Sequence, residues 1–332
     1  MTSATWADVL AQAIFHTLVA SLFVEALVRT WRVRDPGQRI ALRLTALGYP
    51  LVLFPALVLL FPVRAGDAFR EGGALLVGRR WADVRLLGTG MYQWFVGGLA
   101  AMGLALLLMD LVPFLWRRRR ARPPEPAAPD PETAARLGAT LAELAARLGT
   151  RAPALVWVER GAPILFCTGI RRPAVVLSRG ALRLLDAAEL RAALAHELAH
   201  LARRDPAASW VVLLARVAMG LNPAFQVVSR ALARDAEWLA DDHAAEACGD
   251  RLALASGLLK LHRATAGPPP VPVRRTVPLA AALSEPLARV RSRDIELRCR
   301  RLLQPPAPRL PFGAARVALA ALTLTALLFF VV

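Results

Sequence analysis

Four long apolar segments dominate the sequence and restrict the chain to folds that a membrane allows. Each can cover roughly 30 Å of hydrocarbon as a helix of about 20 residues. They span residues 7–28, 39–63, 91–116 and 312–332. With 56% hydrophobic residues and a mean hydropathy of +0.43, the chain is too apolar for an ordinary soluble enzyme. We therefore predict an α-helical membrane protein with four spanning helices and close contact with the lipid bilayer.

Arginines beside the apolar segments predict how the chain crosses the membrane. Lys and Arg near helix ends are retained on the cytoplasmic side. The connection 29–43 holds five arginines, and the run RRRRAR occupies 117–122, so both are expected in the cytosol. The loop 64–90 also holds five arginines, but placing it outside keeps the two strongest clusters inside. The protein is thus predicted to be multi-pass in the cell inner (cytoplasmic) membrane, with 117–311 in the cytosol.

The start of the chain favours retention of the first span. MTSATWAD lacks the basic residues of a cleavable signal peptide, and no small-residue cleavage site closes the apolar run. The first segment is therefore expected to remain as an anchor. Three spans then occupy 1–116, and a fourth occupies 312–332.

The part between the third and fourth spans divides by composition. Residues 117–132 are basic and then Pro-rich, which predicts an extended linker, and 304–311 form a second Pro-rich linker. Leucines at positions 137, 141, 144 and 148 predict an amphipathic helix. Three short apolar runs separated by Gly and Pro predict a small sheet; they cover 154–159, 163–167 and 173–178. We expect a mixed α+β cytosolic domain over 133–303.

The net charge of +17 does not by itself indicate a nucleic-acid partner. The arginines flank apolar segments or scatter through the cytosolic part, with no nucleic-acid-binding motif beside them. Contact with anionic lipid explains them better, and no direct nucleic-acid binding is expected. The three cysteines, Cys167, Cys248 and Cys299, form no CxxC pair, which fits a reducing compartment.

The stretch LRAALAHELAHLARRD (190–205) carries a possible metal centre. Asp186 and Glu189 form a capping-box pattern that predicts the start of a helix. His196 and His200 are one turn apart on that helix, so both imidazoles can reach one Zn²⁺. Glu197 lies beside them, where it can take a proton from water at the metal. The alternative is an ordinary helix with two solvated histidines.

A second acidic pair can complete this centre. A catalytic zinc needs a third protein ligand, and Glu237 and Asp241 are four residues apart in ARDAEWLADDHA. Glu237 is the predicted ligand, and Asp241 is the predicted acceptor that orients a ligand imidazole. A solvated carboxylate face is the alternative. His243 is a candidate for stabilising the transition state, although an exposed histidine is the simpler interpretation.

These motifs resemble a known family. CTGIRRPAVVLSRGALRLLDAAELRAALAHELAHLARRD (167–205) and NPAFQVVSRALARDAEWLADDHA (222–244) are similar to the membrane-bound zinc peptidases of the beta-lactam sensor-transducer (BlaR/MecR) type. The resemblance implies three helices, a cytosolic gluzincin-like domain and a fourth helix, hence an α+β zincin-like metallopeptidase fold. It implies one Zn²⁺ per chain, with the roles already given to His196, His200, Glu197, Glu237 and Asp241.

Two departures from that family shape the functional expectation. Ala240 stands before Asp241 where the family often has Cys, which is nearer to the HtpX and CAAX-prenyl-protease pattern. We expect no external penicillin-binding domain after the fourth span, and this sequence holds no S-x-x-K motif because Lys260 is its only lysine. We therefore do not expect this chain to sense beta-lactams directly.

Three functions remain open from the sequence. The first is a regulatory zinc endopeptidase that cleaves a cytosolic repressor-like protein or itself; the others are an HtpX-like quality-control peptidase and a catalytically silent zinc-bound scaffold. The stretch ELRCRRLLQPPAPRLP (296–311) is expected to be mobile and extended enough to enter an active site. Sensor-transducers of the resembling family cut themselves on the cytosolic side, so the resemblance suggests self-cleavage within 298–302. The alternative is that its arginines rest on anionic lipid headgroups.

Overall fold

The structure, a computed structural model, describes residues 6–65, 69, 85–120, 129–265, 293–305 and 313–330. The chain divides into two compact units. Unit 1 comprises Met1–Ala121, Val211–Ala236 and Ala307–Val332, and unit 2 comprises Arg122–Trp210 and Glu237–Pro306. Residues from three separate parts of the sequence therefore build unit 1.

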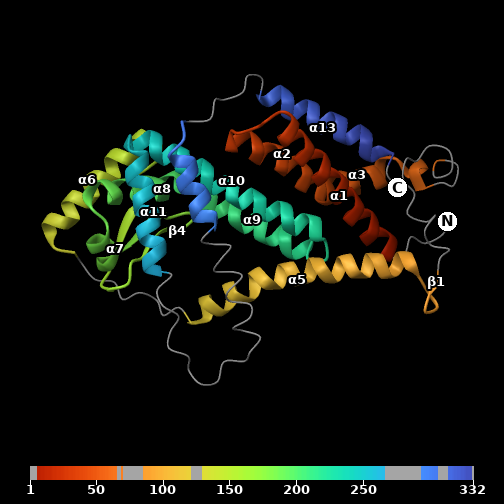
Figure 1. The fold of residues 1–332 in the computed structure, drawn as a ribbon, viewed down its shortest axis with the longest axis horizontal. Helices are drawn as coiled ribbons and strands as arrows, with labels where there is room; N and C mark the ends of the chain where they lie inside the picture. Colours follow the sequence, from red (N-terminus) through yellow and green to blue (C-terminus); the bar gives the residue numbers. More distant parts are fainter. Residues whose placement is uncertain are drawn as a thin grey trace. The chain divides into compact units, whose positions relative to one another are not determined.

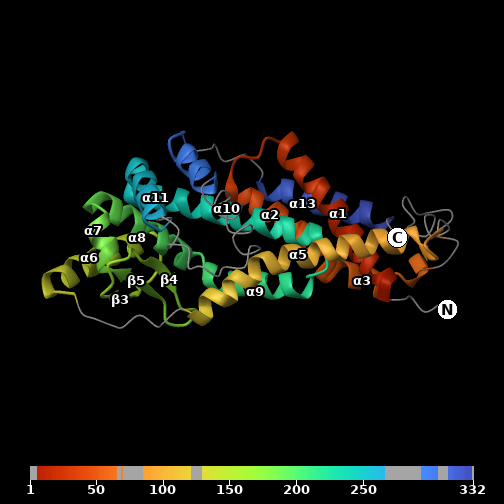
Figure 2. The same ribbon diagram turned by 60° about the horizontal axis from the view of Figure 1, so that its bottom comes forward.

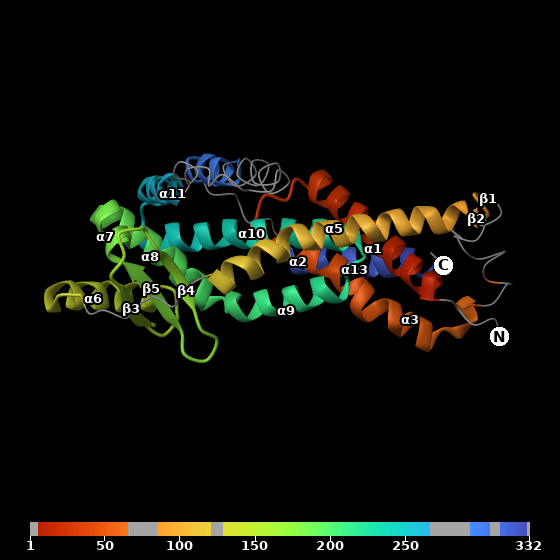
Figure 3. The same cartoon turned by 90° about the horizontal axis from the view of Figure 1, so that it is seen from below.

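Unit 1 is helical. Its main helices are α1 (Trp6–Thr30), α2 (Pro36–Gly48), α3 (Phe54–Leu60), α5 (Met91–Arg120) and α13 (Gly313–Phe329). Helix α1 contacts α2, α5 and α13 (Figure 3). Short elements complete the unit: the π-helix Tyr49–Leu53, the 3-10 turn Pro62–Ala65, and the hairpin β1 (Arg85–Leu86) and β2 (Thr89–Gly90). A buried apolar cluster from α1, α2 and α13 includes Val24, Leu42 and Leu324.

Two helices of the described residues are long and apolar enough to cross a membrane. They are Ala11–Thr30 within α1, with a mean hydropathy of 1.6, and Gln93–Val112 within α5, with 2.1. Helix α13 is apolar but has 17 residues. These findings agree with a membrane protein that also carries a separate domain, whereas the four-span arrangement stays a prediction.

The second predicted span, 39–63, is not one regular helix. Helix α2 ends at Gly48, the π-helix Tyr49–Leu53 follows, and α3 begins at Phe54. Pro50 and Pro55 lie within this stretch, and a proline has no N–H for the helical ladder. A π-helical turn is a common way to accommodate such an interruption. The hydropathy pattern showed the apolar length but not the break.

Unit 2 combines a small sheet with helices (Figures 1 and 2). The strands are β3 (Ala154–Val158), β4 (Leu165–Thr168) and β5 (Ala174–Ser178), in the order β3-β5-β4. Strand β3 is parallel to β5, and β4 is antiparallel to it, which makes β4 an edge strand. The three predicted strands are thus confirmed, within a residue or two at their ends.

The helices of unit 2 surround α8 (Ala187–Ala202). Helices α6 (Pro131–Arg147) and α11 (Arg251–Thr265) and strand β4 all contact it. Helix α7 (Arg179–Leu184) and the helical residues 293–302 complete the unit. The predicted leucine stripe of α6 is confirmed, because Leu137, Leu141 and Leu144 are buried.

Two further helices each contribute residues to both units. Helix α9 (Asp205–Ala218) begins in unit 2 and continues in unit 1, and α10 (Pro223–Cys248) begins in unit 1 and ends in unit 2. The boundary in α10 falls between Ala236 and Glu237. The predicted metal ligand Glu237 is therefore the first residue of the second part of unit 2.

The predicted linker 117–132 is helical at both of its ends. Residues 117–120 continue α5, and α6 already begins at Pro131 with Asp130 as its N-cap. Proline is tolerated at the first helical position, where its missing N–H costs no hydrogen bond. Residues 121–128, and 306–312 after the helical residues 293–302, lie outside the described residues.

Candidate metal centre

Helix α8 presents two histidines on one face. Its N-terminus has the predicted capping box: the Asp186 side chain accepts from Glu189 N, and the Glu189 side chain accepts from Asp186 N. Leu194 and Leu198 are fully buried and fix the rotation of the helix. His196 is 6% exposed, and the neighbouring turn carries His200. The helix is thus anchored at its start and along its core face before it reaches the histidines.

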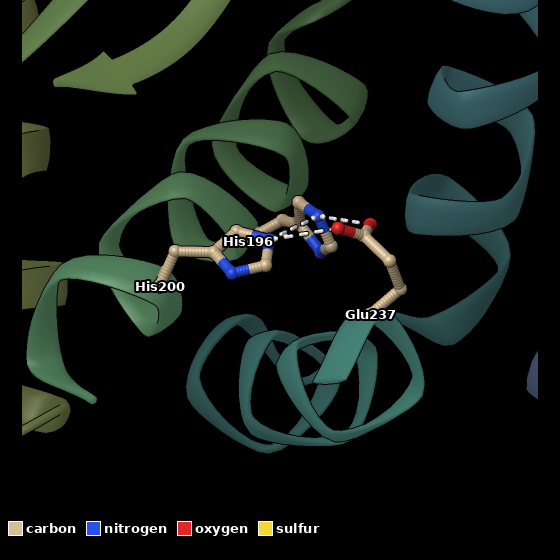
Figure 4. Close-up of side chains that lie close together, drawn as sticks. All are labelled: His196, His200 and Glu237. Atoms are coloured by element: carbon tan, nitrogen blue, oxygen red, sulfur yellow. Dashed lines mark hydrogen bonds and ion pairs between the residues drawn. The ribbon is translucent and has the colours of Figure 1, made fainter. Parts of the chain in front are cut away.

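Helix α10 brings Glu237 to the two imidazoles (Figure 4). His196 Nε2 lies 3.1 Å from His200 Nε2 and 3.5 Å from Glu237 Oε2. His200 Nε2 lies 3.6 Å from Glu237 Oε1. These three residues are a group of potential ligands that could hold a metal ion, found among the described residues.

The spacing of these atoms suits a tetrahedral zinc ion. Zinc–nitrogen and zinc–oxygen bonds near 2.0–2.1 Å place the ligand atoms of a tetrahedral site about 3.3–3.5 Å apart. The two nitrogens are 3.1 Å apart, and each lies at a similar distance from one Glu237 oxygen: His196 Nε2 is 3.5 Å from Oε2, and His200 Nε2 is 3.6 Å from Oε1. Both imidazoles also direct the same atom, Nε2, toward the group. The donor set of two imidazoles and one carboxylate therefore fits zinc.

A carboxylate lies behind each imidazole. Asp241 Oδ1 is 3.0 Å from His196 Nδ1, as the sequence predicted for an orienting acceptor. Asp205 Oδ2 is 2.7 Å from His200 Nδ1, and this partner was not predicted. A carboxylate at Nδ1 fixes the ring orientation and keeps Nε2 available as the ligand atom.

A tight turn after α8 places Asp205. Arg204 adopts a positive φ of 58°, so the chain reverses immediately after the helix. Its N–H bonds to Leu201 O. Asp205, five residues after His200, would not share its face on a continuous helix. The helical pattern therefore hid it, although it lies within the quoted motif.

Glu197 is held by the edge strand. Its Oε2 accepts a hydrogen bond of 2.7 Å from Cys167 N on β4. Glu197 is half-buried and follows directly after His196 on α8. One carboxylate oxygen is thus fixed by the backbone, which leaves Oε1 for other partners.

Arg298 is the second residue that the sequence analysis missed. It lies in the helical residues 293–302 and is 9% exposed. Its side chain contacts two acidic residues of α10, the ligand candidate Glu237 and the orienting residue Asp241. The expectation of an extended segment at 298–302 is therefore wrong. Contact of Arg298 with lipid does not fit its burial, whereas self-cleavage within 298–302 stays a prediction.

His243 is not brought into the group. It is half-buried on α10, two residues after Asp241, and two residues correspond to about 200° around a helix. Its side chain therefore starts from a different face of α10 than Asp241. Its stabilising role stays a prediction.

The charged residues around the metal centre shift the pKa values of His196 and Asp241. Burial disfavours a charged His196, but Asp241 and Glu237 outweigh this and raise the pKa of His196 to about 9. Burial opposes ionisation of Asp241, yet its bonds with Arg298 and His196 lower the pKa of this carboxyl. Without metal, His196 thus holds a proton, which a bound cation would displace.

The pKa of Cys167 is also raised, with burial as the main cause. Burial, helped by the charge of Glu197, raises the pKa of the Cys167 thiol to about 12. A thiol that stays protonated is a poor metal ligand and a poor nucleophile. The cysteine therefore contributes its backbone N–H to the site, and its side chain packs against the core of unit 2.

Comparisons with known proteins agree with this centre. The family described as BlaR1 peptidase M56 matches residues 99–283, which is more than half of the chain. The chain therefore belongs to the BlaR1 peptidase M56 family, whose members are membrane zinc metallopeptidases. The matched range includes the whole group of ligand candidates.

Curated relatives named Protease HtpX homolog are also similar. The one from Burkholderia multivorans is 33% identical over 173 residues, 42% of this chain and 60% of the relative. The one from Paenarthrobacter aurescens is 34% identical over 166 residues, 41% of this chain and 57% of the relative. In both, the match spans less than two thirds of the relative's length. The one from Burkholderia ambifaria is 30% identical over 232 residues, 57% of this chain and 81% of the relative.

Proposed function

We propose that this protein is a membrane zinc endopeptidase in which His196, His200 and Glu237 hold one zinc ion. The observation that carries the proposal is the meeting of their ligand atoms, 3.1–3.6 Å apart, beside Glu197. When bound there, zinc supplies Lewis-acid chemistry: it acidifies water and polarises the scissile carbonyl. Asp241 and Asp205 orient the two imidazoles for this purpose.

Glu197 acts as the general base. Oε2 is fixed by the Cys167 N–H, so Oε1 accepts the proton of the attacking water as its oxygen bonds to the carbonyl carbon. The same carboxyl then gives that proton to the leaving nitrogen as the C–N bond breaks. One residue thus moves the proton from water to the amine.

The β4 edge supports a peptide substrate. Ser178 N on β5 donates to Ile164 O, and the alternation of an antiparallel pair then turns the backbone groups of Leu165 and Cys167 away from β5. Because the Cys167 N–H already donates to Glu197, an extended peptide added along this edge would pair with the remaining outward backbone groups and pass beside Glu197. A substrate bound as an extra strand is therefore our expectation.

We propose a regulatory role with a cytosolic repressor-like protein as the substrate, and membership of the BlaR1 peptidase M56 family supports this proposal. The similarity to proteins named Protease HtpX homolog supports the alternative, quality control of membrane proteins. A catalytically silent scaffold is the least favoured of the three, because Glu197 adjoins the zinc ligands and its position is fixed.

We further propose that the protein is multi-pass in the inner membrane, with the peptidase unit in the cytosol. The arginine clusters at 29–43 and 117–122 support this orientation. A reporter fused after Glu125 should read cytosolic, and one inserted near Gly73 should read external. The reverse pattern would place the centre outside and exclude a cytosolic substrate.

The decisive test of the enzyme is Glu197→Gln in the full-length, detergent-purified protein. Zinc content should stay near wild type, and hydrolysis of an unstructured protein substrate should fall by several powers of ten. Glu143→Gln, which changes an exposed carboxylate of α6, is the matched control and should keep its activity. Activity of Glu197→Gln within about tenfold of wild type would remove the general-base role.

A further inference from the structure

We infer that Arg298 is a positioning residue of the metal centre, which holds Glu237 and Asp241 in the geometry that zinc requires. The inference rests on the proposed zinc site and concerns a residue outside both sequence motifs. It assigns a role to the helical residues 293–302, which begin almost 50 residues after the end of α10.

The guanidinium of Arg298 binds Asp241 at two points. Nε donates to Asp241 Oδ2 at 2.8 Å, and Nη2 donates to Asp241 Oδ1 at 2.7 Å. Asp241 is 1% exposed, so its charge has little access to water. This fork fixes the carboxylate plane, and Oδ1 of the same carboxylate lies 3.0 Å from His196 Nδ1. Arg298 therefore sets the orientation of the His196 ring through Asp241, and its Nη2 also lies 3.3 Å from His196 Nε2 itself.

The third nitrogen of the same guanidinium reaches the third ligand. Nη1 lies 2.9 Å from Glu237 Oε2. A carboxylate that offers both oxygens occupies two coordination positions, whereas a catalytic zinc keeps one position open. By engaging Oε2, Arg298 leaves Oε1, 3.6 Å from His200 Nε2, as the oxygen available to the metal. One side chain thus steers a ligand and the partner of another ligand.

The charge balance supports the same role. Three carboxylates lie against the two imidazoles, those of Glu237, Asp241 and Asp205. Arg298 contacts the first two, and Arg203 lies 3.4 Å from the third. A lysine could replace the charge but has no planar fork, so it could not bind Asp241 and Glu237 together in this way. The geometry of the guanidinium, and not its charge alone, is therefore required.

Arg301 provides a matched control within the same helix. It pairs with Asp242 of α10 through Nη1 at 2.8 Å and also bonds to Trp238 O. Arg301 thus links the same two helices as Arg298 but contacts none of the proposed ligands. A residue that only fastens these helices together would behave like Arg301.

The experiment compares zinc affinity and the visible spectrum of the Co²⁺-substituted protein in full-length wild type, Arg298→Lys, Arg298→Met and Arg301→Met. We expect both Arg298 variants to bind zinc about 10–100-fold more weakly and to show an altered Co²⁺ spectrum. Arg301→Met should keep the wild-type spectrum and an affinity within about threefold of wild type. If Arg298→Met does not fold, Arg298→Lys alone decides.

Two outcomes separate the inference from the proposed function. Wild-type affinity and spectrum in Arg298→Lys, or equal losses in Arg298→Lys and Arg301→Met, would overturn the positioning role. Failure of the wild-type protein itself to bind zinc would instead overturn the zinc site on which the inference rests. Glu237→Ala, which removes a proposed ligand, gives the reference zinc affinity and Co²⁺ spectrum for a site that lacks one ligand.

Discussion

Both units bury charged side chains, but they arrange them differently. In unit 1, buried Arg43 of α2 pairs with Glu25 of α1 at 2.7 Å and with buried Asp235 of α10. In unit 2, the Nε2 atoms of His196 and His200 converge with Glu237. Opposite charges compensate one another in the first set, whereas ligand atoms face one another in the second. Burial of charge alone therefore does not identify a functional site; convergence of ligand atoms does.

A second ionic set in unit 1 follows the same pattern. Asp110 of α5 accepts from Arg230 Nε of α10 at 2.9 Å and pairs with Arg216 of α9. Arg216 also donates to Gln226 Oε1 at 3.0 Å. These bonds tie α9 and the first part of α10 to α5 within unit 1. Ionic groups inside a membrane protein are commonly paired in this way.

Breaking the ionic set of unit 1 should give the largest effect on stability. Asp235→Asn removes one charge that pairs with Arg43 and that also lies 3.2 Å from Arg39 Nε. Arg43 keeps Glu25 but loses its fully buried partner. Breaking a buried pair costs up to about 3–5 kcal/mol, so the unfolding midpoint in detergent should fall. Zinc stoichiometry below that midpoint should stay at one. Loss of zinc from a folded Asp235→Asn protein would contradict the distinction between the two sets.

A change behind a ligand should have a smaller effect of a different kind. Asp205→Asn keeps the shape of the side chain but weakens the acceptor at His200 Nδ1. We expect zinc affinity to fall about 10–100-fold, with little change in the unfolding midpoint of the metal-free protein. Competition with a calibrated chelator measures this directly. An unchanged affinity would show that His200 needs no acceptor at Nδ1.

The sequence predicted the parts of the centre that obey helical periodicity. His196 and His200, and Glu237 and Asp241, are pairs four residues apart, so their shared faces follow from helix geometry. The capping box at Asp186 and the leucine stripe of α6 were predicted for the same reason. Local repeats of this kind need no knowledge of the tertiary fold.

The missed features depend on contacts between distant parts of the chain or on turns. Arg298 joins the centre from a helix 57 residues after Asp241, within a stretch whose arginines and prolines suggested a spacer. Asp205 returns to His200 because Arg204 adopts a left-handed conformation. The π-helix Tyr49–Leu53 interrupts an apolar run that hydropathy treats as continuous. None of these features has a period that a sequence pattern can display.

X-ray absorption at the zinc edge of the purified, zinc-loaded protein tests the central claim most directly. The account predicts about one zinc per chain, bound by two imidazole nitrogens and carboxylate or water oxygen at about 2.0–2.2 Å, with no sulfur ligand. In Glu237→Ala the stoichiometry should fall well below one. A sulfur shell at about 2.3 Å, or full zinc occupancy in Glu237→Ala, would contradict the centre formed by His196, His200 and Glu237.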